Sequence, residues 1–289
     1  MKKGNFLTLL RATRVERAFY IVSLILVPAT FANKITADIL ILSICCILLY
    51  SVSGIHNAKR DKDFSLPEYY KKFMILLVIS AILLSLTNLI IFITVIIELV
   101  LGLIYNTVSR KILFGDATVL GFTHAAIPVL ASSLLVNLNF LLALKLAGIL
   151  YIFIWLLGNA RNQKDSKEDK KRGYRTYATI LKDPRTVTKI FIRLSFFVML
   201  ISFLIFELST KYIIVLCLIY LIHLIVFILT DMKKDILAMQ ITRLTIILFS
   251  LAFVIDKTSN YYIISLDLIL ALLFLIFITP DIKKFVKNT

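Results

Sequence analysis

Residues 73–105 read FMILLVISAILLSLTNLIIFITVIIELVLGLIY, an apolar stretch of 33 residues with one charged side chain, Glu98. A single helix needs about 20 apolar residues to cross the hydrocarbon core of a bilayer. The stretch is therefore too long for one membrane span, and the polar pair Thr87-Asn88 near its centre predicts a turn. We expect two membrane-spanning helices that run in opposite directions.

Similar apolar stretches, separated by short polar segments, occupy most of the remaining chain. Hydrophobic residues make up 60% of the 289 residues, the mean hydropathy is +0.93, and there are only 8 Gly and 5 Pro. This composition excludes a soluble globular domain and a disordered chain. It predicts an all-α, polytopic membrane helical bundle of ten transmembrane helices, with nine as the alternative count. The expected spans are residues 18–33, 37–55, 73–87, 89–106, 116–134, 137–158, 190–207, 211–230, 241–256 and 261–279.

The distribution of basic residues supports this count. When ten spans alternate across a bilayer, 29 of the 33 Lys and Arg residues fall on one side, whereas Lys34, Lys211 and Lys257 fall on the other. Cytoplasmic loops of membrane proteins carry such an excess, so both termini are expected in the cytoplasm. This topology, with attraction to anionic lipid headgroups, accounts for the formal charge of +16 without a nucleic-acid partner.

Two polar segments with similar chemistry interrupt the apolar pattern. Residues 57–63 read NAKRDKD and follow the second predicted span, and residues 162–176 read NQKDSKEDKKRGYRT and follow the sixth. Both spans run toward the cytoplasm, so both segments are expected on that side. Asp61 and Asp165 are 104 residues apart, which predicts two parallel four-helix repeats around a central cavity. We expect a single membrane-embedded domain over residues 1–289, with repeat halves at about 9–111 and 112–239 and C-terminal helices at 240–289.

The spacing within the two segments favours a metal site. Asn57 and Asp61 are four residues apart, and Asn162, Asp165 and Asp169 follow one another at i, i+3 and i+7, so each set lies on one face of a helix. Carboxylates stacked in this way repel one another unless a cation lies between them. Mg²⁺ commonly uses one or two carboxylates and completes its shell with water and substrate phosphate oxygens. Two such faces opposite each other are suited to hold a Mg²⁺–diphosphate complex.

These segments and other polar residues also have simpler interpretations. Either polar segment alone is most simply a solvated connector, but two equivalent segments on one side of the membrane favour a shared site. Glu98 is expected to be neutral, paired or lining a wet cavity, because a charged carboxylate is costly at bilayer depth. His124 and His223 have no second ligand at i+4, and packing or a helix–helix hydrogen bond is the favoured interpretation of both.

At the two polar segments the chain resembles the UbiA superfamily of intramembrane prenyltransferases. Members carry Asn-(Asp/Gln)-x-x-Asp-x-x-x-Asp after the second helix and Asp-x-x-Asp-x-x-x-Asp after the sixth. The second motif is matched well, with Asn162 at the first Asp position. The first motif departs from the family at Ala58 and Ser65, and Asp63 stands two positions before the last expected Asp. Further matches are Asp165, Asp169, Gly173, Arg175 and Thr176 in the second motif, Asn57 and Asp61 in the first, Tyr105 with Arg110 and Lys111 after the fourth span, and Arg14 before the first.

The resemblance implies an enzyme that transfers a prenyl group from an allylic isoprenyl diphosphate to a small aromatic or lipid-precursor acceptor. Its implied cofactor is Mg²⁺, and its implied partners are the isoprenyl diphosphate, a hydrophobic or amphiphilic acceptor and the lipid bilayer. We expect an integral protein of the cell (cytoplasmic) membrane whose active site faces the cytoplasm. The alternative is a small-molecule transporter or a non-catalytic lipid-binding protein of the same fold. Asp61, Asp165 and Asp169 are the expected catalytic residues, these three with Asp63 the metal ligands, and Asn57, Asn162, Lys164, Arg172, Arg175, Tyr105 and Arg110 the substrate-binding residues.

Overall fold

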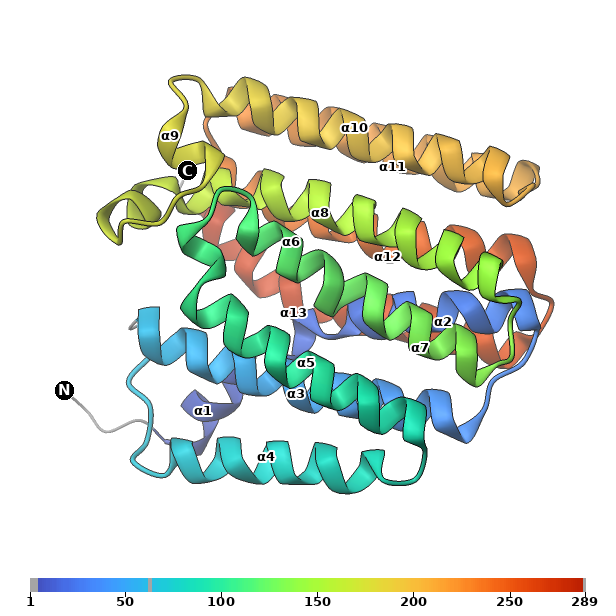
Figure 1. Ribbon diagram of the computed structural model, residues 1–289. Helices are drawn as coiled ribbons and strands as arrows, with labels where there is room; N and C mark the ends of the chain where they lie inside the picture. Colours follow the sequence, from blue (N-terminus) through green and yellow to red (C-terminus); the bar gives the residue numbers. More distant parts are fainter. Residues whose placement is uncertain (1–4, 62–63, 288–289) are drawn as a thin grey trace.

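The computed structural model describes residues 5–61 and 64–287, and every regular element within these ranges is helical (Figure 1). The long helices lie side by side along one direction, and the polar segments at the ends of α3 and α8 lie at the same end of the bundle. The helices are α1 (Phe6–Thr13), α2 (Phe19–Ala32), α3 (Ala37–Asp61), α4 (Tyr70–Ser85), α5 (Leu89–Thr107), α6 (Gly115–Gly121), α7 (Ile127–Leu135), α8 (Phe140–Lys171), α9 (Tyr177–Ile180), α10 (Pro184–Ile205), α11 (Thr210–Asp231), α12 (Asp235–Lys257) and α13 (Tyr261–Lys287).

The prediction of an all-α membrane bundle is confirmed. Each predicted span contains one helical segment of the described chain, and eight of these segments are long and apolar enough to cross a membrane. The other two are α4, which has 16 residues, and the apolar part of α13, Tyr261–Ile276. That these two helices also cross the bilayer remains a prediction.

The predicted turn in the apolar stretch of residues 73–105 lies at Asn88. The side-chain oxygen of Asn88 accepts a hydrogen bond from the backbone N–H of Ile90 at 2.9 Å, which caps the start of α5. Its Nδ2 donates to Oδ2 of Asp38 on α3 at 3.1 Å. Asn88 therefore both ends the α4–α5 connection and ties it to α3.

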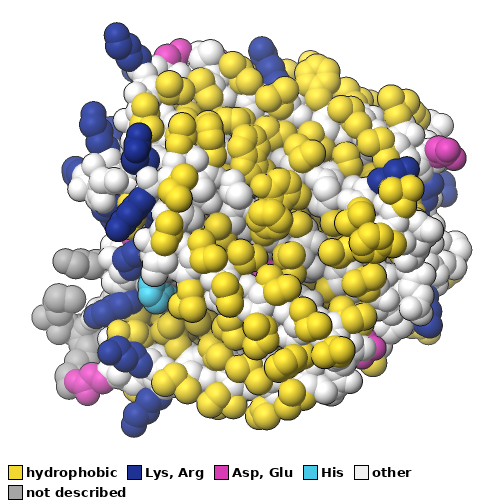
Figure 2. Space-filling view, in the orientation of Figure 1, with side chains coloured by type: hydrophobic (Ala, Val, Ile, Leu, Met, Phe, Trp, Pro, Cys, Tyr) yellow, Lys and Arg dark blue, Asp and Glu magenta, His cyan; other side chains and the backbone are white. Residues whose placement is uncertain are grey.

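The surface of the bundle matches a protein embedded in lipid. Hydrophobic side chains cover the middle of the face in Figure 2, and Lys and Arg gather at the end where α3 and α8 finish. Large apolar side chains such as Leu204 (73% exposed) and Ile214 (67% exposed) point outward from α10 and α11. The opposite faces of the helices pack inward against a core that includes Phe153, Phe249 and Phe253.

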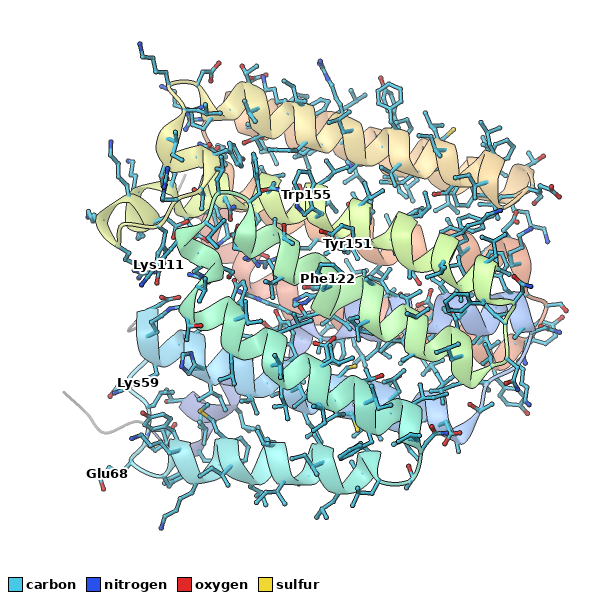
Figure 3. All side chains as sticks on the ribbon, in the orientation of Figure 1. Lys59, Glu68, Lys111, Phe122, Tyr151 and Trp155 are labelled. Carbon is cyan, nitrogen blue, oxygen red and sulfur yellow. The ribbon has the colours of Figure 1, made fainter. Side chains whose placement is uncertain are left out.

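The segment Gly115–Leu135 bends around the place where the site lies. Between α6 and α7 it forms one turn of π-helix, η3 (Phe122–Ala126), a local irregularity that is frequent at functional sites. Aromatic contacts fix this turn against α8, where Phe122 and Tyr151 have ring centroids 4.8 Å apart and Trp155 Nε1 donates to Oγ1 of Thr118 at 3.2 Å (Figure 3). The bend presents Thr123 and His124 to the interior.

The N-terminal helix α1 packs across α3 at a glycine. A Cβ atom at Gly54 would lie 2.2 Å from the backbone oxygen of Thr13, so only glycine allows this approach. The chain then leaves α1 through Arg14, whose φ of 53° places it in the left-handed region, and enters a 3-10 turn, η1 (Val15–Arg17). The contact therefore decides where Arg14 and Arg17 lie.

Candidate active site

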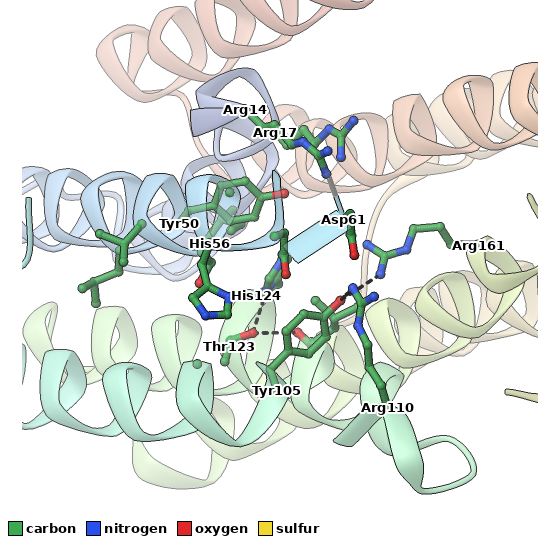
Figure 4. Close-up of a pocket in the computed structure, with 18 of the residues that line it drawn as sticks. Arg14, Arg17, Tyr50, His56, Asp61, Tyr105, Arg110, Thr123, His124 and Arg161 are labelled. Atoms are coloured by element: carbon green, nitrogen blue, oxygen red, sulfur yellow. Dashed lines mark hydrogen bonds between the residues drawn. The ribbon is translucent and has the colours of Figure 1, made fainter. Parts of the chain in front are cut away.

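A cavity of about 820 Å³ lies between η1, α3, α4, α5, η3, α8 and α12. Figure 4 shows Arg14 and Arg17 on one side of it, with Tyr105 and Arg110 on the other and Asp61 and Arg161 near one end. Of the residues predicted from the sequence, eight line this one cavity: Asn57, Asp61, Tyr105, Arg110, Lys164, Asp165, Asp169 and Arg172. The predicted convergence of Asp61 and Asp165, which are distant in sequence, is confirmed.

Asp61 ends α3 and connects it to the end of α8. Its carboxylate accepts hydrogen bonds from Arg60 (Nε to Oδ1, 3.0 Å) and from Arg172 (Nη1 to Oδ1, 3.0 Å). One turn earlier on α3, Oδ1 of Asn57 is buried and has no hydrogen-bond partner among the described residues. An amide oxygen left in this state is costly, and a ligand in the cavity is the partner it can gain.

The α8 side of the cavity carries alternating charge. Asp165 accepts a hydrogen bond from Nζ of Lys164 at 2.7 Å, while 48% of its side-chain surface remains exposed. Asp169, one turn later, is buried, and Arg161, one turn earlier, also lines the cavity. Asp165 is thus paired on one side and open to a ligand on the other.

Tyr105 joins the α5 wall to the α8 wall. Its hydroxyl oxygen accepts hydrogen bonds from Nη2 of Arg110 at 2.9 Å and from Nη2 of Arg161 at 3.3 Å. The Arg110 guanidinium also lies over the rings of Tyr105 and Tyr174, 5.0 and 5.2 Å from their centroids. These contacts hold two guanidinium groups in fixed positions facing the cavity.

The oxygen donors around the cavity fit a hard divalent cation. The described residues contain no ready-made cluster of three or more His, Cys, Asp or Glu side chains that could hold a metal ion. Mg²⁺ does not require one, because it commonly binds through one or two carboxylates plus substrate oxygens. The unpartnered Oδ1 of Asn57, the open carboxylate of Asp165 and the carboxylates of Asp61 and Asp169 supply such donors. Asp63, also predicted as a ligand, lies outside the described residues.

The part of the cavity farther from these charges is apolar. Its walls include Leu49, Val78, Leu99 and Leu103 from three helices. Glu98 reaches this region with a buried Oε1 that has no hydrogen-bond partner in the described part of the chain. Of the expectations for Glu98, the structure therefore shows the cavity-lining one. The cavity is therefore amphiphilic, with most of its charges at the end of the bundle where α3 and α8 finish.

Two predicted residues lie elsewhere. Asn162 is buried beside α6, where its Nδ2 donates to Oδ1 of Asp116 at 3.4 Å, and it does not line the cavity. Arg175 is exposed, and its backbone N–H donates to the carbonyl of Arg110 at 3.0 Å. The cavity face of α8 thus passes through 161, 165, 168 and 172 and leaves residue 162 on the neighbouring side.

Several cavity residues were not predicted as site residues. His124 was expected to pack or to hydrogen-bond between helices; it lines the cavity, with Nδ1 2.7 Å from Oγ1 of Thr123. Arg161 is four residues before Asp165, and that spacing was available in the sequence. The other cavity residues missed include Arg17, Tyr50, His56, Glu168 and Arg243.

Comparison with known proteins places this geometry in a family. The model of the UbiA prenyltransferase family matches residues 61–247. No curated protein sequence matches the chain. A UbiA homologue from Aeropyrum pernix K1 superposes with a TM-score of 0.64 at 12% identity, over 83% of this chain and 98% of the other. A digeranylgeranylglyceryl phosphate synthase superposes with a TM-score of 0.62 at 15% identity, over 86% of this chain and 97% of the other. A UbiA homologue from Archaeoglobus fulgidus superposes with a TM-score of 0.54 at 14% identity, over 86% of this chain and 99% of the other.

Proposed function

Because this chain belongs to the UbiA prenyltransferase family, we propose that it catalyses Mg²⁺-dependent transfer of a prenyl group from an allylic isoprenyl diphosphate to a small acceptor. Family membership supports an intramembrane prenyltransferase, and the proposal adds the cofactor and the substrates. The acceptor is an aromatic or lipid-precursor compound that reaches the cavity within the bilayer. The active site faces the cytoplasm of the cell membrane, where both substrates' polar groups meet water.

The observation that carries the proposal is the amphiphilic cavity. Asp61 and Asp165 line it together with Arg172, and its apolar region is walled by side chains such as Leu99 and Leu103. An isoprenyl diphosphate has the same division into a charged head and an apolar tail. A soluble phosphate ester would not need the apolar walls, and a simple lipid would not need the charges.

Asn57, Asp61, Asp165 and Asp169 are the residues that would hold Mg²⁺. When bound, the ion supplies positive charge to the diphosphate oxygens and so favours their departure as a leaving group. The binding of Cd²⁺ by the Archaeoglobus fulgidus homologue supports a metal role for this site. Asp165 is the ligand with the most free surface, because Asp61 already accepts hydrogen bonds from two arginines.

The transfer breaks the bond between the allylic carbon and the diphosphate oxygen, and the electron pair leaves with the diphosphate. The acceptor atom then donates an electron pair to that carbon and releases its own proton. Lys164, Arg110 and Arg172 stabilise the negative charge that grows on the diphosphate, an electrostatic effect that is strong where water is excluded. The apolar walls keep water away from the allylic cation and so disfavour hydrolysis.

The test is transfer by the purified protein. The protein is incubated with labelled geranyl, farnesyl, geranylgeranyl and longer diphosphates, a panel of phenolic and lipid-precursor acceptors, and either Mg²⁺ or EDTA. We expect a prenylated product that requires Mg²⁺. Binding of prenyl diphosphates without release of diphosphate under any condition would favour the non-catalytic or transport alternative instead.

A further inference from the structure

A recess of about 50 Å³ adjoins the main cavity on the side of α2, α8 and α12. His124, Arg161 and Arg243 line both spaces, so two guanidinium groups stand at the boundary between them. The recess is large enough for a water molecule or a small ionised group. Apolar side chains make up much of its lining, but the presence of His124, Arg161 and Arg243 distinguishes it from a purely apolar packing defect.

Arg243 is the residue in this recess that most needs a partner. It lies eight residues after the start of α12, about 12 Å along the helix axis, and the helix beyond it is apolar. A cation at such a depth is costly and normally pairs or serves a function. In the described parts of the chain Arg243 makes no ion pair, and its guanidinium donates one hydrogen bond, from Nη1 to Oε1 of Gln240 at 2.5 Å.

The cations around Arg243 add to this excess of positive charge. Arg17 and Arg161 lie close enough for their charges to act on it. Arg161 donates a hydrogen bond to the hydroxyl oxygen of Tyr105 at 3.3 Å, and among the described residues Asp116 and Asp165 lie near it without forming an ion pair. At the end of α3, by contrast, Asp61 balances Arg60 and Arg172 directly. The positive charge of Arg161 and Arg243 is therefore available to an anion, whereas Arg17 is already paired with Glu16 at 3.6 Å.

We propose that Arg161 and Arg243, assisted by Arg17, bind a carboxylate or phosphate group of the acceptor. The inference rests on the proposed function and names its acceptor class: a small amphiphile with an ionised carboxylate or phosphate. Two guanidinium groups provide the paired N–H donors that suit either anion.

The position of the recess assigns the anion to the acceptor and not to the leaving diphosphate. Arg161 lies one turn, about 6 Å along the axis of α8, farther into the molecule than Asp165. The diphosphate occupies the end of the cavity at Asp61, Asp165 and Arg172. An acceptor anchored at Arg161 and Arg243 therefore approaches the allylic carbon from the inner side, opposite the departing diphosphate.

The test measures anion binding after the diphosphate site has been filled. Protein in detergent with Mg²⁺ is saturated with farnesyl thiolodiphosphate, a slowly reacting analogue, and titrated by calorimetry with benzoate, phenyl phosphate and the neutral benzamide. The same titrations are made on Arg243→Gln, on Arg243→Lys, and on Arg193→Gln. Arg193 is an exposed arginine of α10 that does not line the cavity and serves as the matched control.

We expect wild type to bind at least one of the two anions about tenfold or more tightly than benzamide, because hydrogen bonds to charged groups are the stronger ones. The preferred anion distinguishes a carboxylate from a phosphate acceptor. Arg243→Gln should lose this preference, Arg243→Lys should keep part of it, and Arg193→Gln should keep it all. The affinity for the thiolodiphosphate should stay within about twofold of wild type in Arg243→Gln.

Two results overturn the inference. In one, wild type binds the anions no more tightly than benzamide, or binds none of the three compounds. In the other, Arg243→Gln weakens binding of the thiolodiphosphate as much as binding of the anions. That result would assign Arg243 to the diphosphate site. Failure of the proposed function is a separate result, in which wild type does not bind the thiolodiphosphate. The anions are then titrated without it, and the comparison with Arg243→Gln still decides whether the recess binds them.

Discussion

Asp165 and Asp61 differ in how much of each carboxylate is free. Both line the cavity, but the Asp61 side chain is 13% exposed and bonded to two arginines, whereas that of Asp165 is 48% exposed and bonded to one lysine. Arg60 and Arg172 already stabilise the charge of Asp61, so a metal must compete with them. Asp165 can bind a cation without losing Lys164. We therefore expect the larger share of metal binding to come from the α8 side.

Asp165→Ala should lower the transfer rate by orders of magnitude, because it removes a ligand that stabilises charge developing in the transition state. The folded fraction should change little, since Asp165 belongs to the charged cavity wall and not to the apolar core. The measurement is turnover against Mg²⁺ concentration. Asp231→Ala, which removes a surface carboxylate paired with Lys189, is the control and should be close to wild type. Unchanged turnover in Asp165→Ala would contradict the proposed metal site.

Gly102 tests the apolar part of the cavity. Among the described atoms, a Cβ atom there meets Oγ of Ser53 at 3.8 Å, and Gly102 lines the cavity, so we expect a larger side chain to project into it. Gly102→Leu should raise the KM for long prenyl diphosphates several-fold and affect short ones less. Gly148→Leu, on the exposed side of α8 where a Cβ meets no described atom within 4 Å, is the matched control. Equal effects on short and long substrates would show that the tail lies elsewhere.

At the scale of elements, the contact between α1 and α3 is a positioning device. Gly54→Ala places a Cβ 2.2 Å from the backbone oxygen of Thr13, so α1 must move. Overpacking of this kind costs about 1–3 kcal/mol, and the displacement carries Arg14 and Arg17 away from the cavity. We expect a rise in substrate KM larger than that in Gly148→Ala, together with a lower melting temperature. A lower melting temperature with unchanged KM would mean that α1 stabilises the fold without shaping the site.

A buried carboxylate outside the cavity, that of Asp267, connects the helix α13 to α2. Asp267 accepts a hydrogen bond from Oγ of Ser23 on α2, and the carbonyl of Ser23 accepts one from Ser250 on α12 at 2.7 Å. Asp267→Ala leaves the Ser23 hydroxyl without its acceptor, which should cost about 1–3 kcal/mol of stability. Thermal unfolding in detergent should report this loss, whereas turnover per folded molecule should stay near wild type. Asp267→Asn, which keeps an acceptor, should be the milder variant.

At the scale of the whole molecule, the sequence was most informative where one short signal acts locally. The hydrophobic pattern predicted the long apolar helices but not the short helices α1 and α9, and Asn88 predicted the α4–α5 turn because its side chain caps the next helix. Helical spacing brought Asp165 and Asp169 to one cavity wall. The same spacing wrongly predicted Asn162 on the cavity face, because that face of α8 is centred on Arg161, Asp165 and Arg172.

Features that depend on tertiary packing had little or no signal in the sequence. Arg243 stands near the start of a predicted span, where a basic residue normally reaches the membrane surface, so its inward position required the packing of α12 against α8 and α2. The close approach of α1 at Gly54 likewise depends on two backbones meeting. The π-turn that presents His124 follows from contacts of Phe122 and Tyr151 across two helices.

The topology of the whole molecule gives the last prediction. Lys211 lies at the start of α11 and Lys257 at the end of α12, and the two helix ends are neighbours, because Nζ of Lys257 donates to the carbonyl of Glu207 at 3.0 Å. This end is opposite the one where α3 and α8 finish (Figure 1). The excess of basic residues predicts that the α3–α8 end faces the cytoplasm. In a variant with Cys45, Cys46 and Cys217 replaced, single cysteines at Lys211 and Lys257 should therefore react with an impermeant maleimide added to intact cells. A cysteine at Lys182, between α9 and α10, is the control and should react only after the cells are opened. The reverse labelling pattern would show that the protein has the opposite orientation, with the charged end of the cavity outside the cytoplasm.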